Sequence, residues 1–514
     1  MIRGRVAKNQ RSKVMTAQDD PKILTFGQRS WNWAKGRITA GTVIDARHVK
    51  GVEKYLMFFH GSGPKKENKM KKAIACLWMT VAGVMSCRAG LPPLAGDGVT
   101  DDTSAIQARL DAGTTLVYLP PPKANYRISR TLRIGSNTEL RLDRNTVIRL
   151  APGSDCPMIE NKCYRQGQDV RITVSGGIWD FANLDQSPNP QQYGRLVPPR
   201  PSPLPNAHEY DFFFGMAMRF SNLTHATFEH LTIRNPTSYG LALCKTSYFL
   251  VNDISFDYTT WNPIALNMDG VHCDGFCHHG RISVLRGTCF DDLVALNAND
   301  GQCAQTEGPI HDIDIDGIYA EYCHSAVRLL SAGKDLRRVT IRNVHGNFYT
   351  YVVGLTHYFP EKPRGTFDDI VISDVFASKV LAPDSLGVYS RTNYPPIWIQ
   401  GPVDVGRLTV RNFAREERNV SVSTLRVDSM AKVRHLDLNG IRMENHMDRP
   451  IQFLDIRGHV DRLTMSGMDF LPSPAAWLMQ DPEGTSSAVS RTLRLKETVL
   501  KEQAKGLTGH AEEL

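Results

Sequence analysis

The chain has 514 residues, enough for two or three ordinary domains or for one long repeat domain. Its 61 lysines and arginines against 53 aspartates and glutamates leave a net charge of only +8, which excludes the dense basic surface of a nucleic-acid-binding protein and is compatible with an acidic substrate. Neither a glycine-rich phosphate loop nor a Cys-x-x-Cys pair occurs, so we expect no cofactor and no metal.

The first 69 residues contain two strand-like segments, Trp31–Thr42 and Lys54–Pro64. Together they make residues 23–64 resemble a fragment of the five-bladed propeller of the family 43 glycoside hydrolases. A single blade has no neighbour on which to bury its face. We therefore expect residues 1–69 to be a non-native or truncated, disordered fragment.

Residues 70–89 have the three parts of a secretory signal peptide. The basic start Met70-Lys71-Lys72 is followed by the apolar run 73–84 and then by small residues around Cys87. The run is too short to span a bilayer, and a buried helix is the alternative. We expect the natural start at Met70 and a secreted, periplasmic or outer-membrane-associated protein, with Cys87 as a candidate lipid anchor.

The mature chain opens with GDGVTDDT at residues 96–103, where Asp102 or Thr103 can cap a short helix over 104–112. Short strands are expected after it, over 115–119, 126–128, 139–142 and 147–150. This opening resembles that of the pectate-lyase-like superfamily. The resemblance implies a right-handed β-helix that begins behind a capping helix, with Asp101 and Asp102 as turn and cap residues.

An apolar–polar–apolar pattern then returns nine times between residues 231 and 465. Such alternation within a repeat of 23 to 38 residues is typical of a β-solenoid. The sequence predicts an all-β fold, a right-handed parallel β-helix (solenoid) over residues 90–475 with a short N-terminal capping helix. Residues 476–514 are expected to form a cap or tail, and the proline-rich segment 185–212 a long loop beside a substrate cleft.

The ten cysteines leave two interpretations open. An exported protein could form disulfides, with Cys156–Cys163 and Cys273–Cys277 as candidate pairs. Buried free thiols in the solenoid core are the alternative.

Three aspartates, Asp269, Asp291 and Asp292, lie about one coil apart in the chain. Aligning Val271 with Val294 as inward residues places Asp269 directly beneath Asp292, about 4.8 Å away along the solenoid. Carboxylates that close cannot all ionise cheaply, so at least one pKa should rise. A weaker alignment, of residues 265–267 with 295–297, would give a different register.

These motifs resemble glycoside hydrolase family 28, the polygalacturonase group. Asn267-Met268-Asp269 matches its Asn-x-Asp motif, and Asp291-Asp292 matches its Asp-Asp pair. The family's Gly-His-Gly is absent, so His311 or His324 would have to substitute, and Arg328-Leu329-Leu330 stands where we expect Arg-x-Lys. The resemblance implies Asp291 as the general acid, and Asp269 and Asp292 as the groups that activate water.

Four further residues are candidates for substrate binding. Asn267 and Asn297 could line the cleft or belong to asparagine ladders and turns. His272 could orient Asp269 or bind sugar hydroxyls, and Arg328 could bind an acidic sugar or pair with a carboxylate. Four aromatic residues could stack on sugars or pack internally: Tyr349, Tyr351, His357 and Tyr358.

The sequence thus predicts a secreted, monomeric, inverting glycoside hydrolase that degrades a pectic or related plant or algal polysaccharide, with no nucleic-acid partner and no membrane span. Three alternatives remain open. They are a polysaccharide lyase in which Arg328 is the base, an exo-acting glycosidase on neutral sugars, and a glycan-binding β-helix without catalytic activity.

Overall fold

In the computed structural model, residues 90–188, 215–299, 306–383 and 394–472 are described, together with the backbone of 477–480 and 492–493. The propeller-like fragment, the proposed signal peptide, most of the proline-rich loop and nearly all of the expected tail lie outside the described residues. No helix of the described part is long and apolar enough to cross a membrane.

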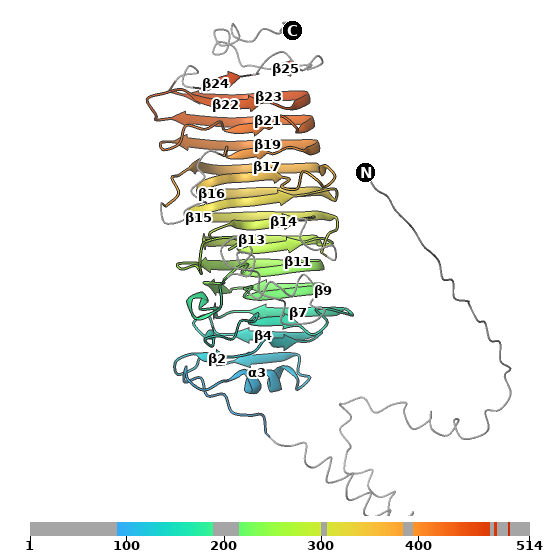
Figure 1. Cartoon of the computed structure of the whole chain (residues 1–514), viewed down its shortest axis with the longest axis vertical. Coiled ribbons are helices and arrows are strands. Elements are labelled where there is room, and N and C mark those ends of the chain that lie inside the picture. Colours follow the sequence, from blue (N-terminus) through green and yellow to red (C-terminus); the bar gives the residue numbers. More distant parts are fainter. Residues whose placement is uncertain are drawn as a thin grey trace, which may run out of the picture. The chain divides into compact units, whose positions relative to one another are not determined.

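Residues 90–493 contain one α-helix, one 3₁₀ helix and 25 strands among the described residues, and each strand pairs in parallel with at least one strand of a neighbouring coil. This is a right-handed parallel β-helix, and its coils stack from α3 (Thr103–Leu110) towards β23 (Figure 1). The predicted fold class is confirmed.

The first half comprises β1 (Leu116–Leu119), β2 (Tyr126–Ile128), β3 (Leu132–Ile134), β4 (Thr138–Leu142), β5 (Val147–Leu150), β6 (Ile159–Asn161), β7 (Asp169–Ser175), β8 (Ile178–Asp180), η4 (Asn183–Asp185), β9 (Met218–Glu229), β10 (Thr232–Arg234) and β11 (Leu241–Asp257). The second half comprises β12 (Val271–Asp274), β13 (His278–Thr288), β14 (Asp292–Asn297), β15 (Ile310–Leu330), β16 (Asp335–Thr356), β17 (Gly365–Lys379), β18 (Ile397–Ile399), β19 (Val403–Glu417), β20 (Leu425–Val427), β21 (Lys432–Asn445), β22 (Ile451–Ile456), β23 (His459–Leu471), β24 (Trp477–Gln480) and β25 (Thr492–Leu493).

Helix α3 starts one residue before the predicted helix and ends two residues earlier. Asp102 occupies the N-cap position, but its carboxylate accepts hydrogen bonds from the backbone N–H groups of Ala95 and Gly96 instead of capping the helix. Asp101 accepts the backbone N–H of Thr103 at 2.9 Å. Both aspartates therefore hold the turn that leads into the first coil.

The long strands bend at the same place in each coil. One residue there adopts positive φ, and the strand pairings skip it, so these residues stand above one another in a column. We call it the corner column: His230, Asp253, Val284, Gly317, Asn343, Asp374, Asn412, Gly440 and Gly467. Glycine, asparagine and aspartate tolerate this left-handed conformation, whereas the β-branched Val284 does not favour it.

The core is a stack of inward apolar side chains that runs the length of the solenoid. One row joins six buried residues on successive coils, Leu241, Val271, Val294, Val327, Val353 and Ile397. Alternate residues on the same strands point outward. The core therefore fixes the register in which outward side chains meet.

All seven cysteines of the described residues are free thiols, and five of them are buried. Cys289 and Cys323 lie 3.4 Å apart, sulfur to sulfur, without a bond. Of the two interpretations of the cysteines, the structure supports the buried thiols, and it contradicts the predicted Cys156–Cys163 and Cys273–Cys277 disulfides.

Candidate active site

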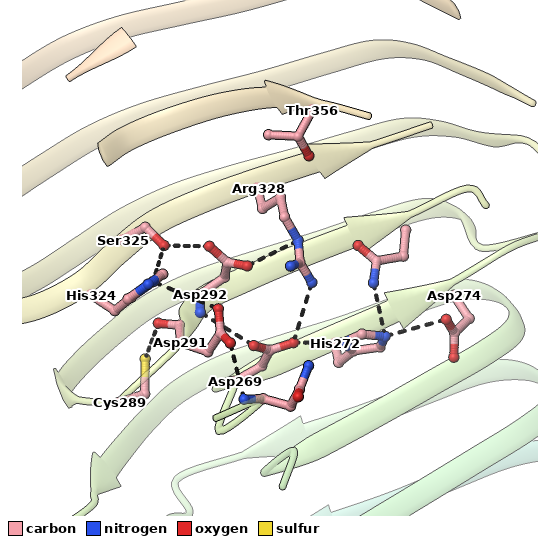
Figure 2. Close-up of polar contacts among 12 residues, drawn as sticks. Asp269, His272, Asp274, Cys289, Asp291, Asp292, His324, Ser325, Arg328 and Thr356 are labelled. Atoms are coloured by element: carbon pink, nitrogen blue, oxygen red, sulfur yellow. Dashed lines mark hydrogen bonds and ion pairs between the residues drawn. The ribbon is translucent and has the colours of Figure 1, made fainter. Parts of the chain in front are cut away.

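The three aspartates come together on the outward face of β12, β14 and the second half of β15 (Figure 2). Val271 pairs with Val294, so Asp269 lies one coil below Asp292 as the sequence predicted. The alternative alignment of residues 265–267 with 295–297 is wrong. Asp291 precedes β14 directly and Asn267 lies just ahead of Asp269, so all four residues belong to one patch.

Asp269 is fully buried and contacts groups from two other coils. Its Oδ1 accepts the backbone N–H of Asp292 at 3.2 Å, and its Oδ2 lies 2.6 Å from His272 Nδ1. The Nη2 of Arg328 lies 3.8 Å from the same Oδ2. Two basic side chains, His272 and Arg328, thus border this carboxyl group.

His272 is fully buried between two carboxylates (Figure 2). Its Nδ1 donates to Asp269, its Nε2 lies 3.2 Å from Asp274 Oδ1, and its ring stacks on Tyr239 at 3.7 Å. Burial alone would lower the pKa of this imidazole, but Asp274 and Asp269 outweigh burial and raise the pKa to about 10. His272 is therefore suited to orient Asp269, and the side-chain amide of Asn297 lies beside its Nε2.

Asp292 is also fully buried and is held from the next two coils. Ser325 Oγ and Tyr351 OH both donate to its Oδ1, the latter at 2.9 Å. Arg328 Nε lies 2.9 Å from its Oδ2. Ser325, Tyr351 and Arg328 thus surround this carboxyl group.

Asp291 lies in a different environment from Asp269 and Asp292. It is 5 % exposed, its Oδ2 accepts the backbone N–H of Asn267 at 3.0 Å, and the ring of His324 lies 3.6 Å from its Oδ1. Burial, followed by the charges of Asp269 and Asp292, raises its pKa well above the ordinary value. The patch thus combines one carboxyl group whose pKa is raised with two carboxyl groups that have cationic neighbours.

Arg328 is the cation that the two carboxylates share, and its side chain is 12 % exposed. Burial lowers its pKa, but Asp292 and Asp269 outweigh burial and raise the pKa well above the ordinary value. Of the two roles expected for Arg328, the structure places it in the carboxylate pairing. In the next two coils the positions in register with it are Gly354 and Trp398, which carry no charge.

The two histidines considered as substitutes for Gly-His-Gly lie in different places. His324 is buried beside Asp291 and Ser325. His311 is on the first half of β15, against His278. Among the aromatic candidates, Tyr351 reaches the site through Asp292. His357 contacts the backbone carbonyl of Pro363 instead.

Sequence reasoning missed Ser325 and Asp274. Ser325 pairs with Asp292 in register, and Asp274 follows His272 by two residues on the same face of β12. Alignment of the Val327 coil with the Val294 coil would have shown Ser325, because only that register keeps both valines inward.

A metal ion is a further option at this site. Asp291, Asp292 and His324 each offer one ligand atom, and these atoms lie within 4.8 Å of one another. Arg328 already supplies a positive charge to Asp292, which reduces the attraction of this group for a second cation.

Comparisons with known proteins show a similarity of fold. No family model matches the chain, and no curated protein matches it. The pre-mature gene product 12 of bacteriophage phi29 is 12 % identical with a TM-score of 0.50, over 77 % of this chain and 54 % of its own. The surface adhesin PfbA of Streptococcus pneumoniae is 13 % identical with a TM-score of 0.49, over 73 % of this chain and 89 % of its own. A family 28 exopolygalacturonase of Yersinia enterocolitica is 16 % identical with a TM-score of 0.47, over 71 % of this chain and 76 % of its own. At these identities the likeness is one of fold.

Proposed function

We propose that this chain is a glycoside hydrolase that cleaves a polysaccharide with inversion of the anomeric carbon. The observation that carries the proposal is the contact geometry of the three aspartates: Asp269 and Asp292 share Arg328, and Asp291 lies beside them with a raised pKa. Glycoside hydrolysis by inversion requires such a pair of opposite protonation states on either side of the scissile bond.

In the proposed reaction Asp291 transfers its proton to the glycosidic oxygen as the bond from that oxygen to the anomeric carbon breaks. A water molecule held by Asp269 and Asp292 attacks the anomeric carbon from the opposite face, and its proton passes to one of these carboxylates. Arg328 and His272 keep both groups charged before the water is deprotonated. Solvent then returns a proton to Asp291 and removes the proton that Asp269 or Asp292 took from the water molecule.

A pectic or related plant or algal glycan is the substrate that we propose, encountered outside the cell by a secreted monomer. Asn267 and Asn297 could hydrogen-bond sugar hydroxyls beside the acid. Arg328 is engaged by two carboxylates and is therefore a weak candidate for binding a uronic acid. Neutral polysaccharides belong in the same test for this reason.

A lyase that uses Arg328 as its base is disfavoured, because the raised pKa of this guanidinium opposes loss of its proton. A glycan-binding protein without activity would have no need of a carboxyl group kept protonated beside two carboxylates. A patch in which ionisable groups have shifted pKa values is more typical of a catalytic site.

The test compares the wild-type chain with Asp291→Asn on pectic polysaccharides, neutral polysaccharides and aryl glycosides. Reducing ends and the ultraviolet absorbance of unsaturated ends are followed, with and without a chelator, and NMR identifies the first anomer released. Asp314→Asn, a surface aspartate paired with Arg281, is the matched control. Inverted saturated product that only Asp291→Asn loses supports the proposal. Unsaturated product, or release that survives in Asp291→Asn, contradicts it.

A further inference from the structure

A cluster of histidines lies on a different row of strands from the candidate active site. His278 and His279 are on β13, and His311 and Asp312 are on the first half of β15. His278 pairs with His311 in register, and their rings stack at 5.0 Å with 10° between the planes. The glycosidase proposal uses none of these residues.

Backbone conformation brings the side chains together. Adjacent residues of a regular strand point to opposite faces, but His279 and Asp312 have φ of 53° and 58° and belong to a second column of bends. As a result, His278 Nδ1 and His279 Nδ1 lie 2.8 Å apart. His279 Nε2 lies 3.9 Å from Asp312 Oδ2, and His311 Nδ1 lies 2.6 Å from the same oxygen.

We propose that His279, His311 and Asp312 bind a divalent transition-metal ion such as Zn²⁺, with His278 as an additional nitrogen donor. One ligand atom from each of the three residues lies within 4.8 Å of the others. Imidazole and carboxylate are ligands that suit zinc, nickel and copper. The ion would join two neighbouring coils of the solenoid.

The contact between His278 and His279 supports the site. Two ring nitrogens 2.8 Å apart cannot both carry a proton, so at least one of the two imidazoles is neutral, the form in which histidine binds a metal ion. All four residues are at least partly exposed, so an ion can reach them.

Two other groups of metal-ligating residues occur in the described part of the chain. Asp291, Asp292 and His324 belong to the candidate active site. Glu416, Glu444 and His446 offer a single imidazole, and Arg418 and Arg442 contact their carboxylates. The cluster on β13 and β15 has the most nitrogen donors of the three.

Replacing Arg338 tests the proposal through a gain, and not a loss, of metal affinity. Its Nε donates to Asp312 Oδ1 at 2.6 Å and its Nη2 to Oδ2 at 2.8 Å, so this guanidinium occupies the carboxylate that the ion would use. Removing the guanidinium should free Asp312 and should also remove a repulsive charge. Arg338→Met is therefore expected to tighten metal binding.

The experiment titrates the tag-free full chain with zinc chloride by calorimetry and follows the thermal midpoint in parallel. His279→Asn and His311→Gln should each weaken zinc binding by about tenfold or more, and asparagine tolerates the positive φ at position 279. His230→Asn is the matched control, because His230 is an exposed histidine with φ of 59° that pairs with Asp253 outside the cluster. Its zinc affinity should equal that of the wild type.

Zinc affinity that falls in both cluster variants, stays in His230→Asn and rises in Arg338→Met supports the site. Equal affinity in the wild type and the cluster variants overturns it, as does unchanged or weaker binding in Arg338→Met. Circular dichroism of each variant shows whether the solenoid is intact. The result does not depend on whether the chain hydrolyses glycans.

Discussion

Arg328 and Asp292 form the contact that organises the candidate active site: Arg328 Nε lies 2.9 Å from Asp292 Oδ2, and both side chains are almost entirely buried. The same guanidinium reaches Asp269. One cation therefore contacts two of the three crowded carboxyl groups, and Asp291 is the one whose pKa is raised.

Replacing Arg328 by Gln should lower kcat by about 10²–10³-fold, a loss typical for one preorganised charged donor. It should also destabilise the fold by about 3–5 kcal/mol, because two buried carboxylates lose their shared partner. Kinetics and denaturant unfolding measure the two effects. Arg426→Gln is the control, since Arg426 pairs with Asp455 at an outward position of a later coil. It should cost stability with kcat unchanged, and equal kcat losses in both variants would refute a special role for Arg328.

The pH dependence of activity should report Asp291. Because its pKa is raised well above the ordinary range, the acid stays protonated near neutral pH, and kcat should fall only as the pH rises through that pKa. Asp291→Asn should lose about 10²–10⁴-fold in kcat together with this basic limb. A wild-type profile whose activity already disappears between pH 4 and 5, near the ordinary aspartate pKa of about 3.9, would contradict the assignment.

Asp291 should also make the fold less stable as the pH rises. A carboxyl group whose folded pKa exceeds its unfolded pKa binds more protons in the native state, so the free energy of unfolding falls between the two values. Asp291→Asn removes this charge and keeps an oxygen that can accept the N–H of Asn267. Thermal midpoints should therefore be higher in the variant than in the wild type, and the difference should grow with pH. A lower midpoint in the variant at high pH would be the contrary result.

His272 should also make the fold less stable as the pH rises, but through the loss of a favourable ion pair. Its folded pKa of about 10 exceeds the ordinary value, so its stabilisation is fully present below pH 6.5 and is lost as the pH rises through 10. His272→Gln should reduce the free energy of unfolding at pH 6 by about 3–5 kcal/mol, as expected when a buried charge loses its partner. The difference between variant and wild type should shrink towards pH 10. His459→Gln, an exposed histidine paired with Asp461, should show no such trend.

Val284 is expected to be a strained position. It has φ of 54° in the corner column, between Asp253 on the coil before and Gly317 on the coil after. A β-branched residue in the left-handed region costs about 1–2 kcal/mol. Val284→Asn should therefore stabilise the fold by about 1 kcal/mol in denaturant unfolding. The matched change Val371→Asn, in a regular part of β17, should destabilise it.

The sequence predicted the relation between Asp269 and Asp292 because two constraints coincide there. Val271 and Val294 must both face inward, and the coil between them has no long insertion. The solenoid and its capping helix followed in the same way from alternation and from the turn at residues 96–103. Asp102 shows the limit of local reasoning, because its carboxylate accepts hydrogen bonds from the backbone before the helix and does not cap the helix itself.

Arg328 shows a second limit. Sequence left its role open between a sugar ligand and an ion pair, because the choice depends on which carboxylates lie beside it in the preceding coils. The role of His272 was open for the same reason, because its contacts with Asp274 and Tyr239 cannot be inferred from spacing in the sequence. The histidine cluster was missed altogether, because its residues meet only where two coils bend at the same place.

The stacked valines of the core keep the position of each rung in space independent of its spacing along the chain. Successive partners Val271, Val294, Val327 and Val353 lie 23, 33 and 26 residues apart in the chain, yet they stand directly above one another. The surplus residues of the longer coils are accommodated outside the paired rungs. Segments between rungs can therefore change in length, and with them the surface around the candidate site, without moving Asp269, Asp291 or Asp292. In evolutionary terms, a solenoid of this kind can exchange the loops around a site while the rungs that hold the site stay fixed.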